Sequence, residues 1–244
     1  MRKYIFFLKC SSAAVMIAAW FFLCIGILGG EIIESGKKLY SQYDEELIIR
    51  DFFNDRKGGI FVDVGCAHYK EMSTTYYLEE HLEWAGIAVD ALAEFAIGYI
   101  QHRPNTRFFN FIVTDHSGDI EPFYRLINAI GLSSTNENFL KKQAESHHVP
   151  KEYQVVYVPT ITLTELLEKN GISKIDFLSM DIERGEPEAL SGFNIKRFKP
   201  GLVCIEVRPE TSDKILDYFA RYGYERIDKY LKYDGLNWYF KPKD

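Results

Sequence analysis

Acidic residues and a glycine follow apolar runs in this sequence, at points where the strands of a parallel sheet would end. Asp63 and Gly65 close the run F-V-D-V-G at residues 61–65, and Asp90 closes a second run at 86–90. In an open parallel sheet, a glycine turn lets the backbone approach a ligand, and an acidic residue that ends the next strand binds ribose hydroxyls. The pair predicts a site for a nucleoside-bearing cofactor.

The turn after the first run differs from a dinucleotide-binding turn. It continues with Cys66, Ala67 and His68, without the second and third glycines that bring backbone close to a pyrophosphate. A cofactor without phosphates therefore fits better, and we expect Asp63 and Cys66 to join Gly65 in binding it. An ordinary strand-to-helix turn is the alternative for this segment.

Two further acidic residues follow a third apolar run. Asp181 and Glu183 end the sequence I-D-F-L-S-M-D-I-E at residues 175–183. Side chains alternate along a strand, so the two carboxylates face the same way if extended backbone continues through residue 182. We expect both in the active site. A structural cap is the alternative, because G-E-P at residues 185–187 suits the start of a helix.

Other charged residues at predicted strand ends have a functional and a structural interpretation. Asp90 binds ribose in the first and caps the following helix in the second, since Asp is a favoured N-cap residue. Asp115 begins a turn sequence, so its side chain could reach an adenine amino group or serve the turn alone. Glu206 and Arg208 are candidates for substrate contacts or for a salt bridge with each other.

The histidines and cysteines show no spacing typical of a metal site. None of the six histidines stands in an H-E-x-x-H pattern, and Cys66 and Cys204 form no C-x-x-C pair. We therefore expect no structural zinc and assign no metal ligands. The cysteines also indicate no disulfide framework.

The acidic residues need a sheet whose parallel strands end at one edge. Alternating strands and helices specify an α/β fold, a doubly wound and mostly parallel sheet with helices on both faces. Asp234-Gly235 is a hairpin turn signal, so the last two strands should pair antiparallel. The expected strands are residues 60–64, 86–90, 107–113, 154–159, 175–181, 202–207, 224–230 and 236–241, and the expected helices are 45–54, 73–84, 91–102, 163–170, 186–190 and 211–222.

Residues 129–150 show no clean helical or strand period. Long irregular insertions in a compact domain are often lids or binding loops, and a solvated loop without substrate contacts is the alternative. The whole chain is 47% hydrophobic, 26% charged and 15% aromatic, a composition typical of globular proteins, and we place one domain at residues 41–244. A formal net charge of −6 argues against a broad surface for nucleic acid.

The amino terminus carries an apolar segment. Residues 10–30 have no charged side chain, enough helix for about 31 Å at roughly 1.5 Å per residue. We predict a single-pass membrane anchor at residues 1–30 and a juxtamembrane connector at 31–40. A cleaved signal peptide and a buried helix of the domain are the alternatives. The basic residues on the two sides of this segment nearly balance, with a weak bias towards an amino terminus inside the cell, which would place the domain across the membrane.

Five motifs in order resemble the FkbM family of S-adenosylmethionine-dependent methyltransferases. They are F-V-D-V-G at 61–65, S-T-T-Y-Y-L-E at 73–79, W-A-G-I at 84–87, V-T-D-H-S-G at 113–118 and I-D-F-L-S-M-D-I-E at 175–183. The resemblance implies a class I, Rossmann-like methyltransferase fold. It also implies S-adenosylmethionine as methyl donor and a hydroxyl of a sugar, glycan or related small molecule as acceptor.

The resemblance also assigns roles to individual positions. It puts Asp63 and Gly65 in the cofactor turn, Asp90 at the ribose position and Asp115 near adenine. Asp181 and Glu183 fall in a D-V-E-G-like motif, and we expect Asp181 to bind the cofactor as well as to act in catalysis. Two positions depart from the family pattern: Asp90, where the family commonly has Glu, and Arg184, where it has Gly.

Methyl transfer from a sulfonium needs an aligned nucleophile and a group that removes its proton. We expect Asp181 or Glu183 to orient and deprotonate the acceptor hydroxyl, with His68 as another possible base. Because S-adenosylmethionine is made in the cytosol, we expect the catalytic domain on the cytosolic face of the membrane. A nicotinamide-dependent oxidoreductase and a membrane-tethered interaction protein without catalysis are the competing hypotheses.

Overall fold

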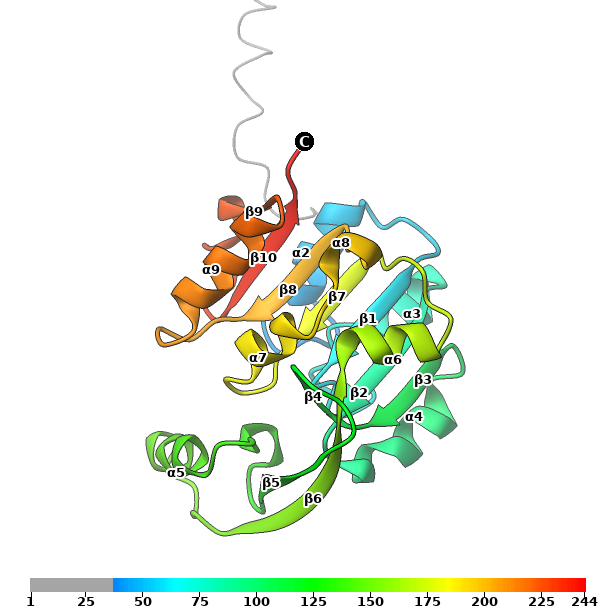
Figure 1. Cartoon of the computed structure of the whole chain (residues 1–244). Helices are drawn as coiled ribbons and strands as arrows, with labels where there is room; N and C mark the ends of the chain where they lie inside the picture. Colours follow the sequence, from blue (N-terminus) through cyan, green and yellow to red (C-terminus); the bar gives the residue numbers. More distant parts are fainter. Residues whose placement is uncertain (1–36) are drawn as a thin grey trace, which may run out of the picture. The chain divides into compact units, whose positions relative to one another are not determined.

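A seven-stranded sheet forms the centre of the protein, whose computed structural model describes residues 37–244. The strand order is β3-β2-β1-β7-β8-β10-β9 (Figure 1). Neighbouring strands from β3 to β8 pair in parallel, whereas β10 pairs antiparallel with both β8 and β9. The strands are β1 (Ile60–Val64), β2 (Ala85–Asp90), β3 (Thr106–Asn110), β7 (Phe177–Met180), β8 (Leu202–Glu206), β9 (Tyr224–Arg226) and β10 (Asn237–Pro242).

Helices cover both faces of this sheet. On one face Val62, Leu178 and Val203 share a large buried cluster with residues of α6 (Leu163–Lys169), α7 (Glu186–Ser191), α8 (Ile195–Phe198) and α9 (Ser212–Arg221). On the other face Ala88 packs against Tyr99 of α4 (Ala96–His102). The helices α2 (Glu45–Phe53) and α3 (Tyr76–Leu82) lie on the same face of the sheet as α4 (Figure 1). The predicted Rossmann-like, mostly parallel α/β fold is therefore confirmed.

A second, three-stranded sheet was not expected from the sequence. Its order is β4-β6-β5, with β4 (Ile112–Thr114) parallel to β6 (Tyr153–Thr162) and β5 (Ile120–Leu126) antiparallel to it. The prediction of one strand over residues 107–113 is wrong, because β3 ends at Asn110 and the chain changes sheets. At this break the Asn110 side-chain amide and the Phe111 backbone N–H both donate to the carbonyl of Asp90.

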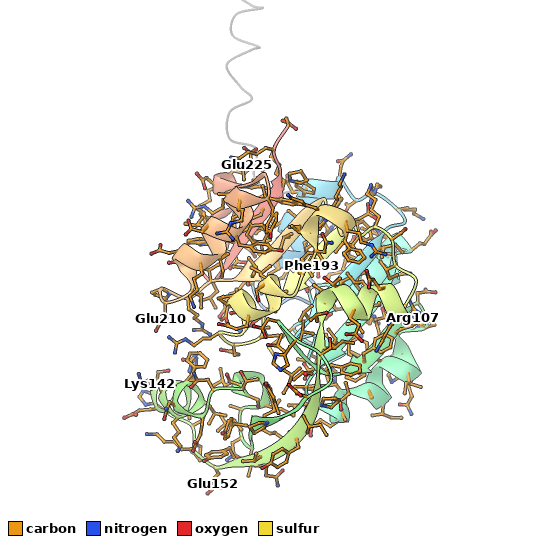
Figure 2. The ribbon with its side chains drawn as sticks, viewed as in Figure 1. Arg107, Lys142, Glu152, Phe193, Glu210 and Glu225 are labelled. Atoms are coloured by element: carbon orange, nitrogen blue, oxygen red, sulfur yellow. The ribbon has the colours of Figure 1, made fainter. Side chains whose placement is uncertain are left out.

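Residues 129–150 are more regular than the sequence suggests. They contain the 3-10 helix η2 (Ile130–Leu132) and the helix α5 (Glu137–Ser146), whose N-cap Asn136 accepts from the Phe139 N–H. With β5 and β6 they form the lower part of the domain in Figure 1. In Figure 2, Lys142 on α5 and Glu152 before β6 mark this part, far from Glu225 on β9.

Several predicted boundaries are corrected. The helix expected at 91–102 is interrupted as η1 (Ala93–Phe95) and α4, and the helix expected at 73–84 is shortened to α3 because its first residues form a turn. The strand expected at 224–230 stops at Arg226, and η3 (Asp228–Tyr230) follows after Ile227. The last two strands do pair antiparallel, as predicted, but through this longer connection instead of a two-residue turn.

The predicted membrane anchor at residues 1–30 lies outside the described residues, as does most of the connector at 31–40. Within residues 37–244, no helix has the length and apolar character needed to cross a bilayer. The described end of the connector is tied to the domain, since the backbone N–H groups of Leu39 and Tyr40 donate to the Glu46 carboxylate on α2.

Candidate functional site

A cavity of about 750 Å³ opens at the carboxyl ends of β1, β2 and β7. Its size is in the usual range for small-molecule sites. The second sheet and the insertion that carries η2 and α5 form its opposite wall. The lining includes Gly65, Ala67, Asp90, Leu92, Phe95, Val113, Asp115, Ser133, Thr135, Asn136, Asp181, Ile182, Glu183 and Arg184.

Gly65 is required at the cavity by geometry. Its φ is +80°, a left-handed conformation, and a Cβ there would lie 1.8 Å from the carbonyl oxygen of Asp181. The Gly65 N–H donates to Val89 and the Asp181 N–H donates to Val64, so both turns are fixed to their neighbouring strands. The missing side chain lets the backbone of the turn after β1 approach the Asp181 carbonyl at the point where β1 and β7 end.

Asp90 lies at the predicted ribose position, half-buried in the cavity wall. Its carboxylate accepts from the backbone N–H of Ala67 at 3.0 Å and of Leu92 at 2.8 Å. Burial raises the pKa of Asp90 to about 6, although both N–H groups act in the opposite direction. The predicted helix-capping interpretation is partly right, because Asp90 caps the turn before α4 and still faces the cavity.

Asp63 and Cys66 lie below the cavity and do not line it. The Asp63 carboxylate is buried, accepts from the Thr75 hydroxyl at 2.7 Å, and has its pKa raised to about 6 by burial. Cys66 packs against Ala88 and Tyr99, and burial raises the pKa of its thiol. Neither side chain therefore lines the cavity in this structure, and both pack around the turn after β1.

A buried arginine, which the sequence did not single out, supports the same region. Arg103 is 2% exposed and forms an ion pair with Glu79, and its guanidinium also donates to the carbonyl groups of Tyr69 and Thr75. The polar network therefore connects the segment after β1 to α3 and α4. Nothing in the local pattern around residue 103 distinguishes it from a solvated helix end.

His68 also lies away from the cavity lining. Its Nδ1 accepts from the backbone N–H of Glu71 at 3.0 Å, and its ring lies 4.5 Å from that of Tyr69. Asp115, by contrast, lines the cavity at its exposed rim. It contacts His116 Nδ1 at 2.7 Å, and this contact lowers the pKa of Asp115.

Asp181 and Glu183 both line the cavity, as expected, but they differ in environment. Asp181 is exposed to the cavity, whereas Glu183 is 8% exposed. Among residues 37–244 the Asp181 carboxylate has no hydrogen-bond partner, while Glu183 Oε2 accepts from Arg208 at 3.0 Å. Although Asp181 is open to the cavity, the surrounding residues shield its carboxylate from bulk water, and this desolvation, together with the neighbouring Glu206 charge, raises the pKa of Asp181.

Glu206 and Arg208 form the salt bridge that was one of their two interpretations. Arg208 lies 2.6 Å from Glu206 Oε1 and also reaches Glu183, so it connects β8 to the turn after β7. Burial raises the pKa of Glu183 and of Glu206 to about 7 despite this cation. Three carboxylates, those of Asp181, Glu183 and Glu206, thus lie beside a single guanidinium.

The insertion is fastened to the turn after β7. The buried hydroxyl of Ser134 donates to the Glu183 carbonyl at 3.0 Å, and the Phe139 ring lies 4.7 Å from the Arg184 guanidinium. Arg184 also pairs with Glu210 in the loop after β8, labelled in Figure 2. The sequence analysis did not identify Ser134 or Phe139 as part of this contact. A signal for the helix itself was present, because Asn136 is a favoured N-cap residue and Phe139 and Gln143 are spaced to share one face.

The cavity fits a compound with the parts of S-adenosylmethionine. The Gly65 turn offers exposed backbone, Asp90 an acceptor for a diol, and Leu92 and Phe95 an apolar wall for a base. The carboxylates of Asp181 and Glu183 suit the positive charge of a sulfonium. These residues could hold such a cofactor without a pyrophosphate-binding loop.

A family model for the methyltransferase FkbM domain matches residues 63–226. The chain belongs to the FkbM methyltransferase family. It is an S-adenosylmethionine-dependent methyltransferase, and this assignment replaces the nicotinamide-dependent oxidoreductase hypothesis. No curated protein matches the FkbM chain.

Solved structures resemble this FkbM methyltransferase at a distance. A TehB-like methyltransferase from Corynebacterium glutamicum is 13% identical, covers 95% of this chain and 98% of its own, and has a TM-score of 0.46. A methyltransferase from Geobacter sulfurreducens in complex with S-adenosylhomocysteine is 12% identical, covers 84% and 76%, and has a TM-score of 0.38. A methyltransferase from Pyrococcus furiosus is 12% identical, covers 95% and 97%, and has a TM-score of 0.38.

Proposed function

We propose that this FkbM methyltransferase methylates a hydroxyl group of a sugar, glycan or related small molecule, with Asp181 as the group that takes the proton. The observation that carries this proposal is the Asp181 carboxylate, which is open to the cavity and has no hydrogen-bond donor among residues 37–244. A carboxylate that faces a cavity without a hydrogen-bond donor is available to accept a hydrogen bond from a substrate hydroxyl.

The far wall of the cavity supports a hydroxyl-rich acceptor. Ser133, Thr135 and Asn136 line it from the insertion and offer hydroxyl and amide groups. Such groups hydrogen-bond readily to sugar hydroxyls. The insertion is held against the turn that carries Glu183, so an acceptor bound to this wall lies near the carboxylates.

The bound cofactor supplies an electrophilic methyl group. The protein's own residues then have three tasks. Asp181 orients the acceptor oxygen and takes its proton as the new carbon–oxygen bond forms. Glu183, held by Arg208, adds negative charge beside it, and the insertion limits the access of water to the cavity.

Substitution of the candidate bases tests the assignment. We expect Asp181→Asn to lower kcat by about 10²–10⁴-fold, the usual contribution of a general base, with S-adenosylhomocysteine affinity nearly unchanged. Glu183→Gln should have a smaller effect on kcat, and His68→Ala a negligible one, because His68 does not line the cavity. Acceptors are identified by screening sugars, glycans and lipid-linked glycans for the mass gain of one methyl group. Normal turnover by Asp181→Asn would reject the role of Asp181.

We also propose that residues 1–30 anchor the domain to a membrane, with the catalytic domain on its cytosolic face. Support comes from the uncharged segment at residues 10–30 and from the cytosolic supply of S-adenosylmethionine. Protease treatment of sealed vesicles whose cytosolic face is outward tests both points. A carboxyl-terminal tag that is degraded without detergent agrees with the proposal, and a protected tag contradicts it.

A further inference from the structure

Three carboxylates converge at the ends of β7 and β8. Asp181, Glu183 and Glu206 each offer one oxygen, and these oxygens lie within 4.8 Å of one another. Asp181 is exposed at the cavity, Glu183 lines the cavity with little exposure, and Glu206 is buried and outside the lining. Carboxylates approach one another this closely when a proton or a cation lies between them.

Arg208, the cationic side chain that touches this group, leaves buried polar atoms without a partner in the described part of the chain, and its own Nε is one of them. Arg208 contacts Glu206 Oε1 and Glu183 Oε2. The other oxygen of Glu206, Oε2, is buried and has no hydrogen-bond partner among the described residues, on a side chain that is 3% exposed. An anionic oxygen that has lost water needs a donor or a cation to replace it.

A fourth acidic side chain repeats this pattern from α7. Glu186 is fully buried, and its Oε1 accepts from the Ile182 N–H in the turn between Asp181 and Glu183. Its Oε2 has no hydrogen-bond partner within residues 37–244. Burial, followed by the charges of Glu206 and Asp181, raises the pKa of Glu186. Two buried carboxylate oxygens therefore have no hydrogen-bond partner in the described residues, one on Glu206 at the end of β8 and one on Glu186 beside the turn after β7.

We propose that Asp181, Glu183 and Glu206 bind a divalent cation of the kind that prefers oxygen ligands, such as Mg²⁺, Mn²⁺ or Ca²⁺. The group contains no thiolate or imidazole, so it does not suit zinc or copper. The expectation of no metal ligands rested on histidine and cysteine spacing, which carries no information about an all-carboxylate site.

The spacing of the oxygens agrees with this class of ion. Three oxygens no more than 4.8 Å apart can all lie within about 2.8 Å of one point, and small side-chain rotations bring them to the roughly 2.4 Å at which Ca²⁺ binds oxygen. Closer approach suits the smaller Mn²⁺ and Mg²⁺. Because Asp181 faces the cavity, water or a substrate oxygen can complete the coordination shell.

Cation binding itself does not depend on which group is methylated, whereas its catalytic role rests on the proposed hydroxyl acceptor. A hydroxyl oxygen bound to the cation becomes more acidic. Its proton then passes to the cavity-facing oxygen of Asp181, and the oxygen electron pair forms the new bond to the methyl group as the sulfur–carbon bond breaks. S-Adenosylhomocysteine is the neutral leaving group.

Binding is tested with Mn²⁺ and the full-length chain, treated first with EDTA and then dialysed. Electron paramagnetic resonance measures free Mn²⁺ without cofactor or acceptor, so the result is independent of methyl transfer. We expect one bound Mn²⁺ per chain, displaced by Ca²⁺ or Mg²⁺. Asp181→Asn and Glu206→Gln should each weaken binding at least tenfold, while the exposed Asp217→Asn on α9 serves as a matched control and binds as the wild type does.

Two outcomes would overturn the site. The first is no Mn²⁺ binding by the wild-type chain at 1 mM, about the upper end of dissociation constants for weak carboxylate sites. The second is binding that Asp181→Asn leaves unchanged. Because Asp181 is exposed to the cavity, Asp181→Asn should fold even if the buried substitution Glu206→Gln does not. A folded Asp181→Asn chain with wild-type affinity therefore gives a clear rejection.

Discussion

A Cβ atom on Gly65 would lie 1.8 Å from the carbonyl oxygen of Asp181. The turn after β1 and the turn after β7 therefore touch through backbone alone. This contact is possible because Gly65 also has a φ of +80°, which side chains disfavour. The turn after β1 and the turn after β7, which carries Asp181 and Glu183, therefore depend on one glycine for their relative position.

We predict that Gly65→Ala disrupts this contact. The overlap involves backbone on both sides, so relief requires the two turns to move apart, and we expect a loss of about 3 kcal/mol or more in unfolding free energy. S-Adenosylhomocysteine affinity should fall at the same time. Urea unfolding and calorimetric titration measure the two effects.

Gly118→Ala is the matched control for this substitution. Gly118 has a φ of +95°, but a Cβ there meets no atom within 4 Å. It should therefore cost only backbone strain, about 1 kcal/mol. Equal losses for the two alanine variants would show that strain, and not the contact with Asp181, limits position 65.

Arg184 yields a second prediction about strained backbone. Glu183 and Arg184 are consecutive non-glycine residues with φ of +54° and +82°. Arg184 gains contacts with Glu210 and Phe139 that partly offset this conformation. A glycine at this position would remove the strain, in keeping with the family pattern.

The two effects separate when Arg184→Gly is compared with Arg184→Ala. Both variants lose the side-chain contacts, but Arg184→Gly also relieves the left-handed backbone. We expect Arg184→Gly to be about 1 kcal/mol more stable than Arg184→Ala in urea unfolding. A more stable alanine variant would mean that residue 184 leaves this conformation once its side-chain contacts are lost.

The central strands were predictable because they are buried on both faces. β1, β2, β7 and β8 read as continuous apolar runs, so their existence and their positions along the chain follow from sequence. β5 gives no such signal, since it contains Pro122 and Arg125 and is half exposed. The break between β3 and β4 depends on hydrogen bonds to Asp90, which no local pattern reveals.

The site divides in the same way. Asp90, Asp181 and Glu183 were identifiable because polar residues at parallel strand ends meet at one edge. The opposite wall depends on how Ser134 and Phe139 dock onto the turn after β7, a long-range contact. Asp63 marks the limit of strand-end reasoning, because it has the right type and place but points below the cavity.

Asp90 gives a prediction for cofactor binding. We expect Asp90→Asn to weaken S-adenosylhomocysteine binding about tenfold or more, because a hydrogen bond to a charged group contributes roughly 1.5–3 kcal/mol. Stability should also fall by about 1 kcal/mol, since the amide can accept from only one of the Ala67 and Leu92 N–H groups. Calorimetric titration and urea unfolding report the two quantities. The exposed Asp213→Asn on α9 is the control, and equal affinities for the two variants would remove Asp90 from the site.

Glu45 makes stability depend on pH. This residue of α2 is 3% exposed, and burial, with a smaller contribution from the Asp234 charge, raises its pKa to about 7. The folded state therefore holds the Glu45 proton more tightly than the unfolded chain, whose glutamate pKa is near 4.3. The resulting stabilisation is complete below about pH 4 and is lost as pH rises to about 7.

We predict that Glu45→Gln removes this loss. The variant should become progressively more stable than the wild type between pH 5 and pH 8, by on the order of 2–3 kcal/mol at the upper end. The change keeps a hydrogen-bond acceptor for the Tyr43 N–H, which the Glu45 carboxylate accepts at 2.6 Å. Urea unfolding at several pH values measures the difference. If the stability difference between the variant and the wild type were constant with pH, Glu45 would be ionised in the folded protein over the whole range. Hydration of the carboxylate or protonation of Asp234 would then account for it.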